Sequence, residues 1–200
     1  MYKIKYVLFL VNLIILPLCS FSQNRNLIDS LEFAVINAKK DTIKVKLLNK
    51  LAYESGKADP EKMLKYSIEA KDLAQQLDFT KGLLSSLSNI SNFYSLKGDF
   101  DKVFEIDKTR MAIAKEKNNK EDIASVHNAI GEYYREKGEF QNAIENYLSG
   151  LKICEELGGL SSEKKSIKIL IAGFFNNMAL VYNNLANPEK SLEYHHKALE

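Results

Sequence analysis

Apolar and polar positions between Ala124 and Leu157 follow the periods of two amphipathic helices. In the first helix, residues that face inward recur at spacings of three, four and seven, and these are His127, Ile130, Gly131 and Tyr134. The second helix shows the same spacing in Phe140, Ala143, Ile144, Tyr147 and Leu151. The pattern predicts a helical hairpin that turns at Lys137-Gly138-Glu139, with small residues where two helices pack closely.

The same unit recurs along the chain. Gly131 aligns with Ser91 one copy earlier and with Ala179 one copy later, and each of the three is followed by a tyrosine three residues on. A degenerate first copy begins near Leu48, and the tripeptide Gly-Asp/Glu-Phe marks the turn in the two middle copies. Such internal repetition predicts a stack of hairpins, each of which buries its apolar face against the next.

These residues resemble the tetratricopeptide repeat (TPR) over about Ile43 to Glu200. The resemblance implies an all-α fold without strands, in which tandem antiparallel helical hairpins stack as a right-handed superhelix, an α-solenoid. The chain departs from the pattern at Val103 and Ser191, where the return helix usually has alanine, and at Arg110, where it usually has a later small residue.

The pattern divides the chain into six segments. Asp41 and Thr42 interrupt the helical period and provide a cap for the next helix. The fourth copy is offset by 48 residues from the third instead of 40, which indicates either a longer first helix or, in the apolar run 168–175, a specific contact surface. The predicted segments are a signal peptide at 1–22, a capping helix at 23–42, a degenerate repeat at 43–79, and repeats at 80–119, 120–160 and 161–200, the last one truncated.

Residues 1–22 have the order of features that is typical of a secretory signal peptide. Lys3 and Lys5 precede an apolar run over 6–18, and small residues surround a cleavage site before Gln23. We therefore expect an exported protein on the periplasmic or extracytoplasmic side of a membrane. A retained anchor is the alternative, whereas Leu18 is too bulky for a lipid-attachment signal at Cys19.

Removal of that segment changes the charge and the cysteine count. The net charge of +2 includes Lys3 and Lys5, so the mature chain is neutral and has no basic cluster of the kind that binds nucleic acid. Cys154 remains as a single cysteine, which excludes an internal disulfide. Its helical spacing from Leu151 indicates a buried apolar position rather than a reactive thiol.

The sequence shows no constellation that is typical of an enzyme, so we expect no catalytic residues, no metal site and no cofactor in this segment. His195 and His196 are adjacent on a predicted helix and point about 100° apart, which does not suit shared metal ligation. His127 takes a position that is apolar in other copies, so a packed histidine is expected. A catalytic domain beyond residue 200 is left open.

A partner-binding face is predicted by its place relative to the small residues. The positions three before, one after and four after them lie on another stripe of the first helices, expected to line a concave groove, and amides and hydroxyls dominate there. The alternative is that these are ordinary solvated positions. The predicted partner-binding residues are Asn49, Tyr53, Ser88, Asn92, Ser95, Asn128, Glu132, Arg135, Asn176 and Asn183.

The function predicted from these features is an exported scaffold that binds a protein or peptide. Signal-bearing repeats of this kind resemble sensory regions of membrane histidine kinases and transcriptional regulators, which implies a part of a larger signalling protein. The alternative is a free-standing periplasmic assembly scaffold. The open C-terminal end, with Leu192 and Leu199, predicts either a longer chain or contact with another one, and a membrane is expected only through the signal peptide or a further C-terminal part.

Overall fold

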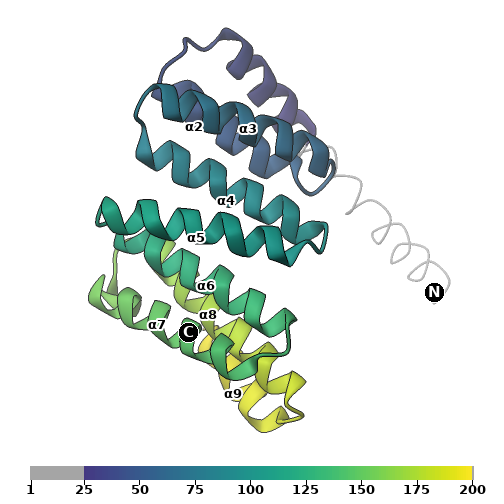
Figure 1. Cartoon of the computed structure of the whole chain (residues 1–200), viewed down its shortest axis with the longest axis vertical. Helices are drawn as coiled ribbons and strands as arrows, with labels where there is room; N and C mark the ends of the chain where they lie inside the picture. The colour runs from purple at the N-terminus through teal and green to yellow at the C-terminus, as the bar shows by residue number, and fades with distance from the viewer. Residues whose placement is uncertain (1–24, 200) are drawn as a thin grey trace, which may run out of the picture. The chain divides into compact units, whose positions relative to one another are not determined.

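The structure is a computed structural model that describes residues 25–199. They form two compact units, one that ends at Asn89 and one that begins at Ile90, and each is described by itself. All regular structure in the described residues is helical, with no strand, so the predicted all-α fold of tandem hairpins is confirmed (Figure 1). The predicted signal peptide at 1–22 lies outside the described residues.

The first unit packs three helices and the start of a fourth. A helix over residues 25–37 precedes α2 (Thr42–Ser55), α3 (Pro60–Gln76) and the first part of α4 (Thr80–Leu96). Asp41 caps α2 as predicted, because its Oδ1 accepts hydrogen bonds from the backbone N–H groups of Ile43 and Lys44. Leu31 and Val35 of the first helix are buried against the hairpin, in a core with Val45, Leu48, Leu51, Ala70, Leu73 and Ala74.

The second unit continues the series of hairpins. It contains the end of α4, α5 (Phe100–Glu116), α6 (Lys120–Glu136), α7 (Phe140–Glu156), a short 3-10 turn η1 (Gly159–Ser161), α8 (Lys165–Asn184) and α9 (Pro188–Lys197). Its main core lies among α6, α7 and α8, and α8 contacts both helices of the preceding hairpin. The buried members of that core are Ala124, Ala143, Tyr147, Cys154, Ile167, Ile171, Phe174, Met178 and Val181.

The turns repeat with the hairpins. Gly98 and Gly138 occupy the same place after α4 and α6, with φ of 72° and 77°, a conformation that glycine adopts without strain. Ala186 takes that place after α8 with φ of 53°. The next residue but one begins the return helix in each case, so the chain reverses in the same way three times.

The longer offset of the fourth copy has two sources. Helix α8 has 20 residues where α4 to α7 each have 17. The remaining difference lies in the link before it, which holds η1. Phe174 is buried while Ile169 is 60% exposed. A longer first helix therefore accounts for part of the offset, and the apolar run is not buried on all sides.

Candidate functional site

In the second unit, aromatic rings fill the contact between α6, α7 and α8 and pack directly on two glycines. A Cβ at Gly131 would overlap the ring of Tyr147, and a Cβ at Gly150 would overlap the ring of Phe174. The two rings meet edge to face with centroids 6.3 Å apart. We refer to this packing of α6, α7 and α8 as the aromatic seam. The small residues face neighbouring helices as predicted, because Gly131, Ser91 and Ala179 are all buried.

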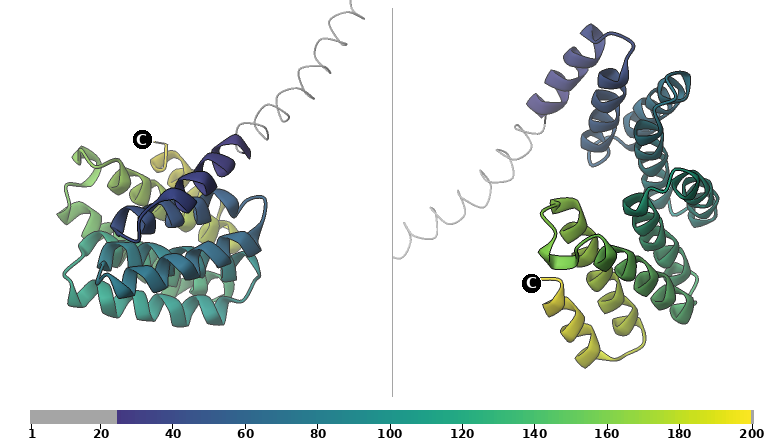
Figure 2. Two further views of the ribbon diagram at one scale, coloured as in Figure 1. Left: turned by 90° about the horizontal axis from the view of Figure 1, so that it is seen from above. Right: turned by 90° about the vertical axis from the view of Figure 1, so that its left-hand side faces the viewer.

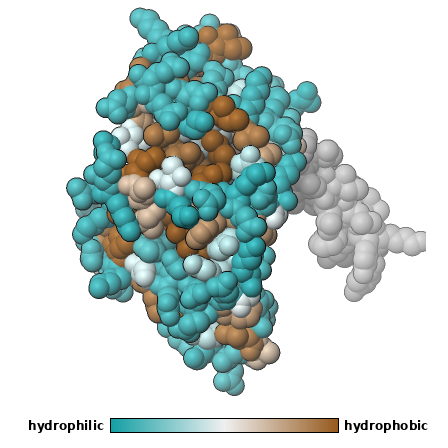
Figure 3. Space-filling view, in the orientation of Figure 1, coloured by the Kyte–Doolittle hydropathy of each residue, from teal (hydrophilic) through white to brown (hydrophobic). Residues whose placement is uncertain are grey.

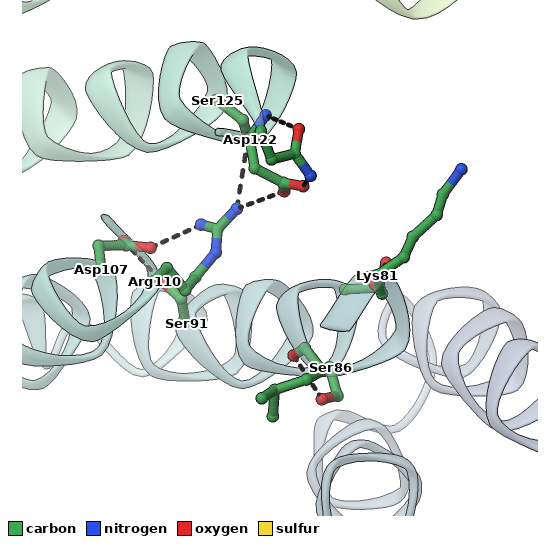
Figure 4. A network of polar contacts seen from close by, with 10 residues as sticks. Lys81, Ser86, Ser91, Asp107, Arg110, Asp122 and Ser125 are labelled. Carbon is green, nitrogen blue, oxygen red and sulfur yellow. Dashed lines mark hydrogen bonds and ion pairs between the residues drawn. The ribbon is translucent and has the colours of Figure 1, made fainter. Parts of the chain in front are cut away.

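The preceding seam, between α4, α5 and α6, is held by charges (Figure 4). Asp107 is fully buried; its Oδ2 accepts a hydrogen bond of 2.8 Å from the Ser91 hydroxyl, and its Oδ1 lies 2.6 Å from Nη1 of Arg110. Arg110 is only 3% exposed and reaches α6, where its Nη2 lies 3.4 Å from the Ser125 hydroxyl and 3.9 Å from Oδ1 of Asp122. We refer to this network as the charged seam.

The electrostatics of the charged seam follow from its burial. Burial raises the pKa of Asp107 above its ordinary value, while the attraction of Arg110 and the hydrogen bonds from Arg110 and Ser91 act against that rise. A buried ion pair of this kind is tolerated only when both members are paired and hydrogen-bonded. The sequence pattern did not predict the network; its one signal was an arginine, Arg110, at a position where the repeat usually has a small residue.

The predicted partner-binding residues of the second unit's last two repeats lie on α6 and α8, two helices that contact each other. Asn128 is half-buried, and its Oδ1 accepts a hydrogen bond of 3.0 Å from Nδ2 of Asn177. That bond joins α6 to α8, whereas Oδ1 of the neighbouring Asn176 lies 3.3 Å from Nδ1 of His195 on α9. Asn176 and Asn183 are exposed. We call the set of Asn128, Glu132, Arg135, Asn176 and Asn183 the amide face.

Arg135 is the cation of the amide face, and two acids surround it. Its Nη2 lies 2.5 Å from Oε1 of Glu136 and 3.9 Å from Oε1 of Glu132. Burial raises the pKa of Glu132, and the negative charge of Glu136 adds to that rise while Arg135 opposes it. Two carboxylates thus surround one guanidinium, and the exposed members of the amide face, Asn176 and Asn183, are amides.

The other predicted partner-binding residues have mixed surroundings. Asn49 is buried in the first unit, where its Nδ2 donates to the carbonyl of Gly82 at 3.0 Å and its own oxygens accept from Asn89. Its polar groups are thus used between α2 and α4. Tyr53 is exposed and Ser88 half-buried in the same unit, and in the second unit Asn92 is exposed and Ser95 half-buried.

The remaining candidates for chemistry have structural surroundings. His127 is half-buried, with Nδ1 at 3.1 Å from Oδ1 of Asn146, and His195 Nδ1 lies 3.3 Å from Oδ1 of Asn176. Cys154 is fully buried, and burial raises its pKa to about 11, which keeps the thiol protonated. Over residues 25–199, no group of three or more His, Cys, Asp or Glu side chains is placed to hold a metal ion.

The lengths and compositions of the described helices also bear on membrane insertion. Among residues 25–199, no helix combines the length and the apolar character that a bilayer crossing requires. The apolar run at 6–18 falls outside this range.

Comparisons with known proteins identify the fold. No family model matches the chain, and no curated protein matches it. Solved structures do match: BtubC from P. vanneervenii has a TM-score of 0.64 and 20% identity over 89% of this chain and 70% of its own. A putative kinesin light chain from Podosopora anserina with TPR-like repeats has a TM-score of 0.60 and 14% identity, over 90% of this chain and 87% of its own.

Two further matches are longer proteins. The apo form of RapI has a TM-score of 0.65 and 16% identity, and this chain covers 58% of it. A signal transduction ATPase with numerous domains and a tetratricopeptide repeat sensor, PH0952 from Pyrococcus horikoshii, has a TM-score of 0.67 and 19% identity, and this chain covers 26% of it. At these identities the likeness shows the fold alone. The chain has the fold of tetratricopeptide-repeat proteins.

Proposed function

We propose that this chain is an interaction scaffold that binds an extended peptide segment of a partner protein on the amide face of α6 and α8. The observation that carries the proposal is that α8, with its exposed Asn176 and Asn183, contacts α6 and is joined by Asn177 to the half-buried Asn128. A carboxamide both donates and accepts hydrogen bonds, so a row of them can pair with successive N–H and C=O groups of a peptide backbone.

Three further features support this site. Glu132 and Arg135 supply one acid and one base beside the amides, which gives the face a means of selecting charged side chains of the peptide. The TPR fold is itself that of interaction scaffolds. The aromatic seam packs α6 and α8 into one core with α7, and helices that are already packed lose little conformational entropy when a peptide binds.

A peptide library displayed on phage tests the proposal, because it samples many sequences and so does not depend on a known partner. Selected peptides are titrated against the wild-type chain and against the triple variant Asn128→Ala/Arg135→Ala/Asn176→Ala. We expect at least a tenfold loss of affinity, since each lost hydrogen bond contributes about 0.5–1.5 kcal/mol. The matched control is Gln75→Ala/Gln76→Ala/Thr109→Ala, which changes exposed polar residues of α3 and α5.

Both variants are checked for helicity and melting temperature before binding is compared. If the control loses as much affinity as the triple variant, or if the triple variant binds normally, the amide face is not the binding site.

We further propose that the protein is exported and acts on the extracytoplasmic side of a membrane as the sensory or interaction part of a larger signalling protein. The order of charged, apolar and small residues over 1–22 supports export. The likeness to a protein with a tetratricopeptide repeat sensor is compatible with a sensory role. The alternative is a free-standing periplasmic assembly scaffold.

Mass spectrometry of the protein from its native cells tests export. A mature form that begins at Gln23 is the expected result, and a cytoplasmic form that keeps Met1 would contradict it. The coding sequence after Glu200 separates the two roles, since a membrane span with a cytoplasmic domain favours the sensor.

A further inference from the structure

The first unit contains a cavity of about 290 Å³ where the first helix meets the turn between α2 and α3. Figure 2 shows that helix, in purple, beside the hairpin of α2 and α3, and the core between them includes Leu31 and Val35. The cavity lies within the first unit and is formed without residues from the C-terminal part of the chain. Its lining residues are Arg25, Ile28, Asp29, Ser55, Ala58, Asp59 and Lys62.

Ser55, the last residue of α2, brings an unpaired polar group to this cavity. It is only 1% exposed, and its Oγ has no hydrogen-bond partner among residues 25–199. Its carbonyl oxygen is already used, because it accepts hydrogen bonds from the backbone N–H groups of Ala58 at 3.1 Å and Asp59 at 2.8 Å. Buried hydroxyls are nearly always hydrogen-bonded, so the unpaired Oγ of Ser55 points to a ligand in the cavity.

The four charged residues of the lining differ in whether they already have partners. Lys62 is held by Glu32, whose Oε1 lies 2.9 Å from its Nζ, and Oδ1 of Asp59 accepts a hydrogen bond of 3.1 Å from the backbone N–H of Lys62. Arg25 and Asp29 form no ion pair with a residue of 25–199. Arg25 and Asp29 are therefore the charged groups that a ligand can engage.

The arrangement of these charges suits a ligand that carries both signs. Arg25 and Asp29 are four residues apart on a helix, so they share a face and are separated by about one turn, roughly 5.4 Å along the axis. The whole lining has two basic and two acidic side chains, which disfavours a ligand that is only an anion or only a cation.

The remaining lining and the size of the cavity narrow the ligand further. Ile28 and Ala58 provide an apolar contact. Hydrophilic residues with apolar ones between them cover the first unit at the upper end of Figure 3, and the cavity shares this mixed character. Ligand pockets usually measure roughly 300–1,000 Å³, so a cavity at the lower end of that range suits a molecule of the size of one amino acid.

We propose that this cavity binds a free α-amino acid with an apolar side chain. The ligand's carboxylate pairs with the guanidinium of Arg25, its ammonium group pairs with the carboxylate of Asp29, and its side chain lies against Ile28. The Ser55 hydroxyl gains its missing hydrogen-bond partner in the ligand. This site lies in the first unit, whereas the amide face lies in the second, and it does not depend on peptide binding there.

A thermal-shift screen of the whole chain against the standard amino acids tests the proposal, with L-leucine as the first probe. Calorimetry then compares L-leucine with N-acetyl-L-leucine, which lacks the ammonium group, and with L-leucine amide, which lacks the carboxylate. We expect each derivative to bind roughly tenfold more weakly, which corresponds to about 1.4 kcal/mol for one lost charge-assisted contact.

Two variants show which residue meets each charge of the ligand. Arg25→Gln should weaken binding of L-leucine roughly tenfold and leave binding of L-leucine amide unchanged, because the amide lacks the group that Arg25 engages. Asp29→Asn should behave in the same way toward L-leucine and N-acetyl-L-leucine. The matched controls are Lys50→Gln and Asp72→Asn, which neutralise exposed residues of the same unit outside the cavity and should leave affinity unchanged.

Ser55→Ala separates a binding role of the hydroxyl from a structural one. The substitution removes a buried polar atom that has no partner, so the variant without ligand should melt at or above the wild-type temperature, while its affinity for L-leucine falls. A lower melting temperature with unchanged affinity would contradict the binding role.

Three results overturn the proposal as a whole. The first is that no standard amino acid shifts the melting temperature, and the second is that both derivatives bind as well as L-leucine. The third is binding of D-glucose without binding of any amino acid, which would assign the cavity to a neutral polyol.

Discussion

The two seams of the second unit each join a hairpin to a neighbouring helix, one through close packing of an aromatic ring and the other through charged groups. In the aromatic seam, Gly150 leaves room for Phe174, and the contact depends on shape. In the charged seam, Arg110 is the eleventh residue of α5 as Gly150 is of α7, and it extends across to α6, where the buried Val126 is smaller than Phe174. The repeat thus fixes where a contact is made and leaves open whether shape or charge makes it.

Substitutions in the two seams should therefore destabilise the unit in different ways. A ring that meets a glycine tolerates no added atoms, but a lost ring atom leaves only a small void. A buried ion pair tolerates a change of both partners better than the loss of one, because a single remaining charge has neither water nor a counter-ion.

The largest effect is expected for Asp107→Ala. It leaves the Arg110 guanidinium buried without its main partner, which costs about 3–5 kcal/mol of unfolding free energy. Urea unfolding followed by circular dichroism measures it. The double variant Asp107→Leu/Arg110→Met, which removes both charges, should recover most of the loss, and a double variant as unstable as the single one would show that charge pairing is not what matters here.

Gly150→Val comes next, with an expected cost of about 3 kcal/mol, because the added atoms overlap the Phe174 ring. Thermal unfolding measures it. Adding Phe174→Leu should restore part of the stability by making room. If Gly150→Val melts like the wild type, the aromatic seam is looser than described.

Ser91→Ala tests the smaller contact of the charged seam. The hydroxyl donates to the buried Asp107 carboxylate at 2.8 Å, and loss of a hydrogen bond to a charged group costs about 1.5–3 kcal/mol. Chemical denaturation of this variant is compared with that of Ser85→Ala, which changes an exposed serine on the same helix. Equal costs would place Ser91 outside the network.

The smallest effect has the opposite sign. A Cβ at Gly173 of α8 meets no atom within 4 Å, so Gly173→Ala should stabilise the unit by about 0.5–1 kcal/mol through helix propensity alone. Its melting temperature is the measurement. Destabilisation would mean that this glycine, like Gly150, has a close neighbour.

The fold was predictable because the same pattern of small residues and turn residues recurs in several repeats. Gly131, Ser91 and Ala179 are small for the same reason, and the turns at Gly98 and Gly138 recur at the same place. The charged seam was not predictable in the same way. Asp107 and Arg110 each look like surface residues of a helix, and only the packing of α5 between α4 and α6 buries them together.

For the candidate residues, the repeat pattern predicts the helix on which each one lies but not what surrounds its side chain. Asn128 and Asn176 lie on helices that contact each other, as their equivalent repeat positions suggested. Asn49 has the equivalent position in the first repeat, yet it is buried by Gly82 and Asn89 of α4. Burial of that kind depends on the close approach of neighbouring helices, and no spacing rule in a single chain reveals it.

The most direct test of the proposed function is an NMR titration of the chain with a selected peptide, in which the side-chain NH₂ signals of asparagine are followed. The account predicts that signals of Asn128, Asn176 and Asn183 shift together and saturate at one affinity. Shifts confined to residues outside α6 and α8, with these three signals unchanged, would contradict it.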